Sequence, residues 1–111
     1  MTDKKDKTLS FLGLARKAGK IASGEFQTEE AVKKRRAQLV ILAEDASDNT
    51  KKKFRSMCEF RQIPVFWFSD KGRLGAAVGC GERSSLAVLD PGFAEVIIKA
   101  LKQDTDRERR Y

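Results

Sequence analysis

The spacing of apolar residues predicts five helices. Apolar side chains three and four residues apart lie on one face of a helix, and this spacing runs from Thr8 to a stop signal at Gly19 and from Gly24 to about Arg35. The three remaining helices follow polar residues that can cap a helix N-terminus: Ser47 or Asp48, Ser69 or Asp70, and Asp90.

Short, continuously apolar runs predict strands that are covered on both faces. The runs span residues 39–43, 65–68 and 86–89, and a shorter segment spans 21–23. Strands that alternate with helices across short turns imply one sheet with helices on both sides. The predicted fold class is therefore α/β, a three-layer α-β-α sandwich around one small mixed sheet of about four strands.

Composition sets the expected domain boundaries. Residues 1–7 are polar and lysine-rich and predict a basic, disordered arm, while residues 103–111 predict a polar tail. Residues 8–102 then form a single domain, long enough to bury one core. No apolar run approaches the length of a membrane span, and the N-terminus lacks the pattern of a signal peptide. We therefore expect a cytoplasmic protein with no membrane partner.

The residue inventory narrows the possible chemistry. The chain has no histidine, which excludes imidazole catalysis and imidazole metal ligation. Its two cysteines, Cys58 and Cys80, are too few for a four-ligand zinc site without carboxylates and too far apart for a redox pair. We expect two reduced thiols, no metal and no cofactor. The 23 basic and 16 acidic residues leave a net charge of +7, which favours an anionic partner.

Three patterns resemble phosphate or nucleotide sites but do not match their motifs. Residues 13–20 have one residue too many for a P-loop, and Ile21 replaces the serine or threonine that would hold magnesium. Residues 79–81 follow a predicted helix, whereas a dinucleotide fingerprint follows a strand. Glu44 and Asp45 follow the central strand, where ligands of α/β sheets gather, and leave a receiver-like phosphoacceptor enzyme as an alternative. The first strand supplies no acidic partner for it.

Several segments together resemble the kink-turn RNA-binding ribosomal proteins. These segments are residues 24–32, 39–46, 63–65 and 74–79. The run Leu-Gly-Leu-Ala-Arg-Lys-Ala-Gly-Lys at 12–20 and the run Asp-Asn-Thr-Lys-Lys-Lys-Phe at 48–54 are most similar to the bacterial YlxQ-like branch of that superfamily. The resemblance extends over nearly all of residues 8–101 and depends on the order and spacing of the segments.

The resemblance implies a non-catalytic protein that binds structured, bent RNA, ribosomal or ribosome-associated. It implies contacts from the N-terminus of the second helix and from the loop before the last strand. The physical chemistry agrees, because exposed N–H groups at a helix N-terminus favour phosphates and a Gly/Ser loop lets the backbone approach closely. The candidate RNA-binding residues are Gly24, Glu25, Phe26, Gln27, Thr28, Lys51, Lys71, Arg83, Ser84 and Ser85.

Three positions depart from the kink-turn pattern. Where its members carry Asn-Glu, which reads sheared G·A pairs, and then a lysine, this chain has Phe26, Gln27 and Glu30. We expect altered guanine readout. The alternatives are that Phe26 staples the helix, that Gln27 closes a capping box with Gly24, and that Lys51–Lys53 form a solvated face. A protein-interaction adaptor that has lost RNA recognition is the alternative function.

Overall fold

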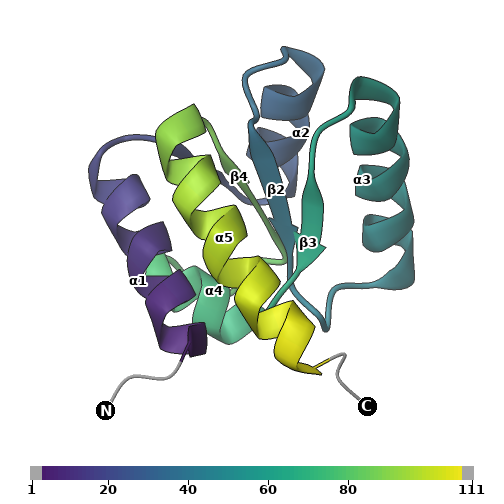
Figure 1. The fold of residues 1–111 in the computed structure, drawn as a ribbon. Coiled ribbons are helices and arrows are strands. Elements are labelled where there is room, and N and C mark those ends of the chain that lie inside the picture. Colours follow the sequence, from purple (N-terminus) through teal and green to yellow (C-terminus); the bar gives the residue numbers. More distant parts are fainter. Residues whose placement is uncertain (1–3, 109–111) are drawn as a thin grey trace.

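The computed structural model describes the backbone of residues 4–108 and the side chains of residues 7–103. Within this part of the chain, helices and strands alternate (Figure 1). The elements are α1 (Lys4–Lys17), β1 (Ile21–Ser23), α2 (Glu25–Lys33), β2 (Leu39–Leu42), α3 (Asp48–Arg61), β3 (Val65–Trp67), α4 (Lys71–Ala77), β4 (Ser85–Val88) and α5 (Pro91–Glu108).

The four strands form one mixed sheet in the order β1-β4-β2-β3. The strand β4 pairs antiparallel with β1 on one side and with β2 on the other, and β2 pairs parallel with β3. This arrangement brings the C-terminal ends of β1, β2 and β3 and the N-terminal end of β4 to the same edge of the sheet. The connections that leave this edge are therefore neighbours in space.

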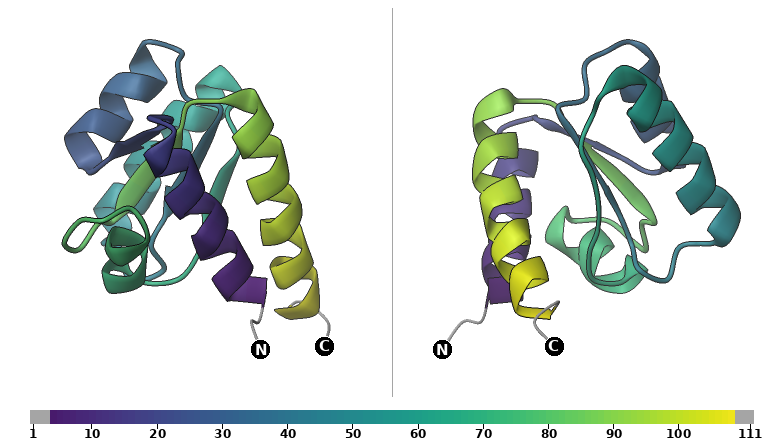
Figure 2. Two further views of the ribbon diagram at one scale, coloured as in Figure 1. Left: turned by 90° about the vertical axis from the view of Figure 1, so that its left-hand side faces the viewer. Right: turned by 45° about the vertical axis from the view of Figure 1, so that its right-hand side comes forward.

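Helices cover both faces of the sheet, as the right-hand view of Figure 2 shows. On one face, Leu12 of α1 and Ile97 of α5 pack with Ile41 of β2 in one apolar cluster. On the other face, Phe54 of α3 packs with Val40 in a second cluster. Neighbouring residues of β2 thus enter different clusters, as the two-residue period of a strand requires. The predicted three-layer sandwich with a mixed sheet is confirmed.

Three of the predicted capping residues accept hydrogen bonds at helix N-termini. Ser47 Oγ accepts from the N–H of Thr50 at 3.1 Å, and Asp70 Oδ1 accepts from the N–H of Arg73 at 2.8 Å. The carboxylate of Asp90 accepts in the same way at the start of α5. Of the alternatives in the sequence, Ser47 and Asp70 are therefore the caps of α3 and α4.

The first four helices end in left-handed residues. Gly19 after α1 and Gly79 after α4 have φ values of 73° and 72°, which glycine adopts without steric cost. After α2 and α3 the same role falls to Arg35 and Gln62, with φ values of 58° and 59°. The predicted stop at Gly19 is confirmed. At Arg35 and Gln62 no glycine marks the helix end in the sequence.

Three predicted boundaries are wrong. The first helix begins at Lys4 rather than Thr8, within the arm expected to be disordered, and α5 continues to Glu108, through most of the tail expected from residue 103. Lysine, glutamine, glutamate and arginine extend a helix readily once a packed segment has nucleated it. Ser85 belongs to β4 rather than to the preceding loop, because it pairs with Leu42. Residues 1–3 and 109–111 lie outside the described residues.

Candidate functional site

Four connections meet at the edge of the sheet where β1, β2 and β3 end and β4 begins. We call this the loop edge; it comprises residue 24, residues 43–47, residues 68–71 and residues 78–85. Backbone hydrogen bonds tie these connections together: the N–H of Glu44 donates to the Ser69 carbonyl at 2.8 Å, and the N–H of Ala43 donates to the Ser84 carbonyl at 3.0 Å. The loop edge is therefore a bonded surface, although its residues come from distant parts of the sequence.

Gly24 opens the N-terminus of α2 at the loop edge. Its φ of 94° and ψ of 159° lie in a region that only glycine occupies readily. The N–H of Gly24 donates to the Ser85 carbonyl at 3.0 Å, which fixes the start of α2 to β4. Since glycine has no side chain to cap the first turn, the first N–H groups of α2 remain available to an external acceptor.

One basic residue, Arg83, lies beside the α2 N-terminus, and its backbone is bonded to a second, Lys71. The N–H of Arg83 donates to the Lys71 carbonyl at 3.0 Å, and Arg83 Nε donates to Ser23 Oγ at 3.4 Å. The Arg83 side chain also lies 3.8 Å from the position that a Cβ on Gly24 would occupy. Neither Lys71 nor Arg83 forms an ion pair with another described residue. The loop edge thus places the unneutralised cation of Arg83 next to an open helix end, and the backbone of Lys71 is hydrogen-bonded to Arg83.

Glu25, another predicted contact, forms an ion pair within the protein. The ammonium of Lys53 lies 2.9 Å from Glu25 Oε2 and 2.7 Å from Glu29 Oε1, and so joins α2 to α3. The hydrogen bond from Lys53, with a further one from Lys33, lowers the pKa of Glu29, and the bond to Glu29 raises the pKa of Lys53. This link operates above the unfolded pKa of Glu29 and is lost as the pH falls through its lowered folded value.

Two predicted contacts, Thr28 and Ser85, have fully buried side chains. Neither hydroxyl oxygen has a hydrogen-bond partner among the described residues. Because both side chains are buried, neither can touch a ligand on the surface of the folded protein. Thr28 lies three and four residues before the buried Ala31 and Val32, which places it on the apolar stripe of α2. Ser84 is half-buried. The contributions of Ser84 and Ser85 to the loop edge are their backbone carbonyls.

The three residues that depart from the kink-turn pattern lie together. Phe26, Gln27 and Glu30 line one hollow of about 340 Å³ between α2 and β1. The side chain of Phe26 is 74% exposed, so it does not staple the helix. No hydrogen bond described for the chain joins Gln27 to Gly24 in a capping box.

Lys51 has partners rather than a solvated position. Its ammonium donates to the Glu44 carbonyl at 2.7 Å and lies 4.3 Å from the centroid of the Trp67 ring. Lys51 therefore joins α3 to the loop edge at Glu44, next to Trp67 of β3. Trp67 was absent from the predicted site because it stands inside an apolar run that indicates a buried strand.

The residues that support the site were not predicted from the sequence. The carboxylate of Asp45 accepts the N–H of Lys71 at 3.0 Å and so fixes the start of α4. Gly75 of α4 is buried, and a Cβ there would come within 2.6 Å of the Gly81 carbonyl carbon. The loop that carries Arg83 therefore rests directly on the backbone of α4. A glycine inside a predicted helix, where alanine is more stable, was the available signal.

Comparison with known proteins gives the family. Residues 6–98 match the model of the ribosomal protein L7Ae/L30e/S12e/Gadd45 family. The chain belongs to this family. It is 40% identical over 91 residues to the RNA-binding protein YlxQ of Bacillus subtilis (strain 168), covering 82% of this chain and 91% of that protein. The resemblance drawn from the sequence is thereby confirmed.

One further relative and two solved structures are similar to this L7Ae-family chain. The YlxQ protein of Enterococcus faecium is 32% identical, with 82% of this chain and 87% of that protein covered. A protein of unknown function from Bacillus halodurans C superposes with a TM-score of 0.84 at 40% identity, covering 86% of this chain and 97% of the other. The 15.5kD RNA binding protein of Giardia lamblia, at 18% identity, superposes with a TM-score of 0.75 over 93% and 89% of the two chains and shares the fold.

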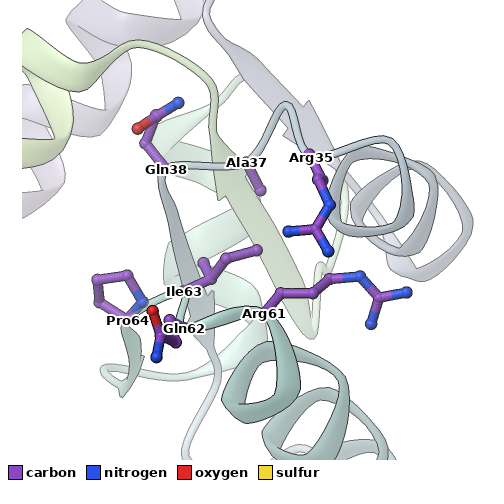
Figure 3. Close-up of a pocket in the computed structure, with 7 residues that line it drawn as sticks. All are labelled: Arg35, Ala37, Gln38, Arg61, Gln62, Ile63 and Pro64. Atoms are coloured by element: carbon purple, nitrogen blue, oxygen red, sulfur yellow. The ribbon is translucent and has the colours of Figure 1, made fainter.

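A basic hollow of about 260 Å³ lies at the opposite edge of the sheet, where β2 and β3 begin. Figure 3 shows Arg35 and Arg61 extending from the ends of α2 and α3 toward the same space. The guanidinium of Arg61 donates to the Met57 carbonyl at 3.1 Å. We call this the far edge. It carries charge of the same sign as the loop edge but has no open helix N-terminus.

Metal, thiol and membrane chemistry leave no further site among the described residues. These residues contain no group of three potential metal ligands among His, Cys, Asp and Glu, and none of their helices has the length and hydropathy to cross a membrane. Both cysteines are free thiols. Burial raises the pKa of Cys58 to about 11, so this thiol stays protonated at neutral pH.

We expect Gly75→Ala to destabilise the protein, because the new methyl group would collide with the backbone of Gly81. Overpacking of this kind costs about 1–3 kcal/mol, more than the ~1 kcal/mol that alanine gains over glycine in a helix. Denaturant unfolding measures the change, and the amide NMR shifts of residues 81–83 report displacement of the loop. Gly72→Ala is the matched control, because Gly72 is exposed on the same helix. Equal stability of the two variants would contradict the packing argument.

Proposed function

We propose that this protein binds structured, bent RNA of the kink-turn type without catalysing a reaction. The observation that carries the proposal is the meeting of Gly24, Lys71 and Arg83 at the loop edge. An open helix N-terminus beside the unpaired cation of Arg83, with the unpaired Lys71 bonded to the Arg83 backbone, is suited to phosphate groups. The names of the two YlxQ relatives, which call them RNA-binding proteins, support RNA as the ligand. We further propose that the RNA is ribosomal or ribosome-associated and that binding takes place in the cytoplasm.

In this proposal the loop edge binds the RNA backbone by two kinds of contact. The first N–H groups of α2 donate to phosphate oxygens, and Lys71 and Arg83 supply charge. Phosphate contacts of this kind dominate affinity and weaken as salt rises. Shape supplies the selectivity, because RNA helices are recognised mainly by their geometry and by unstacked residues at bulges. The loop edge is small, so a bent RNA reaches more of it than a straight helix does.

A protein-interaction adaptor is the second candidate function. It is favoured by the hollow beside α2, which Phe26, Gln27 and Glu30 line. An exposed aromatic side chain at the rim of a hollow suits a protein partner as well as a base. Salt-sensitive RNA binding at the loop edge separates the two functions, because the adaptor needs no cations at Lys71 and Arg83.

The proposal predicts tighter binding to a stem-bulge-stem RNA than to a plain duplex of the same length. The reason is that the bulge bends the RNA around the loop edge, whereas a straight duplex contacts less of the loop edge. Fluorescence anisotropy titrations of both RNAs at several salt concentrations measure the difference. Equal affinities would reduce the interaction to nonspecific electrostatics and overturn the proposed recognition of bent RNA.

We expect the double variant Lys71→Ala/Arg83→Ala to bind the stem-bulge-stem RNA more weakly, with little change in thermal stability. Each lost phosphate contact should reduce the slope of binding against salt by about 1. The control is Arg35→Ala/Arg61→Ala, which removes the same charge at the far edge. Equal losses in the two double variants would show that net charge, rather than the loop edge, determines binding.

Phe26→Ala should lower RNA affinity while leaving thermal stability nearly unchanged, because the ring is 74% exposed. Base stacking on an aromatic side chain contributes about 1–3 kcal/mol per base. We also expect Phe26→Asn/Gln27→Glu, which restores the residues of the kink-turn pattern, to bind a standard kink-turn RNA more tightly than the wild type does. A wild type that already binds standard kink-turns at least as tightly as this variant would contradict altered guanine readout.

A further inference from the structure

Trp67 is the single tryptophan of the chain and lies at the C-terminal end of β3, an edge strand of the sheet. Its side chain is 49% exposed. The ammonium of Lys51 lies 4.3 Å from the ring centroid, and the Glu44 carbonyl holds that ammonium at 2.7 Å. The indole is therefore fixed by a cation–π contact that is itself anchored to the backbone, while half of its surface faces solvent.

The surroundings of this ring are basic. Trp67 lines a hollow of about 220 Å³ with Lys51, Lys52, Arg55 and Asp48, which we call the Trp67 hollow. None of its three cations forms an ion pair with a described acidic residue. Its single carboxylate leaves an excess of positive charge. The next residue of α3, Lys53, differs from these three because two glutamates of α2 neutralise it.

The Trp67 hollow is continuous with the loop edge. Glu44, whose carbonyl holds Lys51, precedes Asp45, whose carboxylate accepts the backbone N–H of Lys71. One connection, between β2 and α3, therefore supports both places. Figure 1 shows the end of β3 and the start of α3 at the same end of the sheet as α4, although α3 and α4 cover opposite faces. Lys51, which lines the hollow, and Lys71 are thus bonded to adjacent residues of this connection.

We propose that the Trp67 hollow binds an unpaired nucleotide of single-stranded RNA adjoining the structured RNA, with its base stacked on the indole and its phosphates beside Lys52 and Arg55. The proposal deepens the RNA-binding function proposed above and rests on it. Every base has a π-face, so stacking on an aromatic ring tolerates any sequence, while the cations hold the backbone. The anchored indole loses little freedom when the base arrives, which reduces the entropic cost of binding.

Two other roles for Trp67 lead to different results. If the ring only protects the edge strand β3 from pairing with another chain, a base on the RNA strand would not tighten binding. As a docking site for an acidic peptide, the hollow would respond to charge without needing a base. The presence or absence of bases on one and the same phosphate backbone therefore separates the three roles.

The test uses the emission of Trp67 in the full chain. The stem-bulge-stem RNA is titrated without an extension, with a short single-stranded extension at either end, and with an abasic version of each extension. We expect a base-bearing extension at one end to quench the emission and to tighten binding roughly 5- to 150-fold over its abasic version. No difference between base-bearing and abasic strands at both ends overturns the proposal.

Variants locate the effect. Trp67→Ala should remove the advantage of the base-bearing strand, while Trp67→Phe should keep most of it, with affinity read by anisotropy and folding by thermal unfolding. The matched control is Phe60→Ala, because Phe60 is an aromatic residue on α3 that is 79% exposed and has Arg61 beside it. An advantage that survives Trp67→Ala, or that Phe60→Ala removes equally, overturns the assignment to Trp67.

The isolated single strands distinguish failure of this site from failure of the proposed function. Quenching by a base-bearing oligonucleotide, and not by its abasic version, supports the Trp67 site even where the stem-bulge-stem RNA does not bind. Binding of the stem-bulge-stem RNA with no such quenching leaves the proposed function intact and overturns the Trp67 site. Quenching by a polyglutamate peptide, without any base-dependent quenching by RNA, also overturns it and indicates an acidic protein partner.

Discussion

The structure depends on two strands that have no exposed side chain. All four residues of β2 and all four of β4 are buried. Apolar side chains therefore project from both faces of the sheet, and a layer of helices must cover each face. The interior of the sheet is then closed to ligands. Polar chemistry is confined to the edges, where the chain turns. The antiparallel pairing of β4 with both neighbours decides which turns share an edge.

The basic character of the chain is divided between structural and available charge. Lys33, Lys34 and Lys53 each contact a glutamate at 3.0 Å or less, and these pairs hold α2 together and join it to α3. Lys71 and Arg83 have no such partner among the described residues. The net charge of +7 therefore indicates an anionic ligand only in general terms, and the pairing pattern locates the cations that can bind it.

Much of the fold could be predicted from the sequence because periodicity reports which residues are apolar on one face. Periodicity predicted five helices and the buried runs of the sheet. Polar residue types narrowed the caps to Ser47 or Asp48, Ser69 or Asp70, and Asp90, of which Ser47, Asp70 and Asp90 are the caps in the structure. The candidate site was harder. The open end at Gly24 lies where the sequence placed it, but periodicity carries no information on partners distant in sequence. Two features depend on such partners: the packing of Gly81 against Gly75 and the contact of the Trp67 ring with Lys51 of α3. Only the folded chain shows them.

The strand order has a consequence for the timing of folding. The last strand in the sequence, β4, occupies a central position, where Val88 stands opposite both Ile21 and Leu39. Until β4 has been synthesised, β1 has no partner and one edge of β2 is unpaired. A nascent chain can form its helices and the parallel pair of β2 and β3, but long-range pairing makes completion of the sheet slow and exposes strand edges meanwhile. Completion of the sheet therefore waits for β4, because only β4 joins β1 to β2.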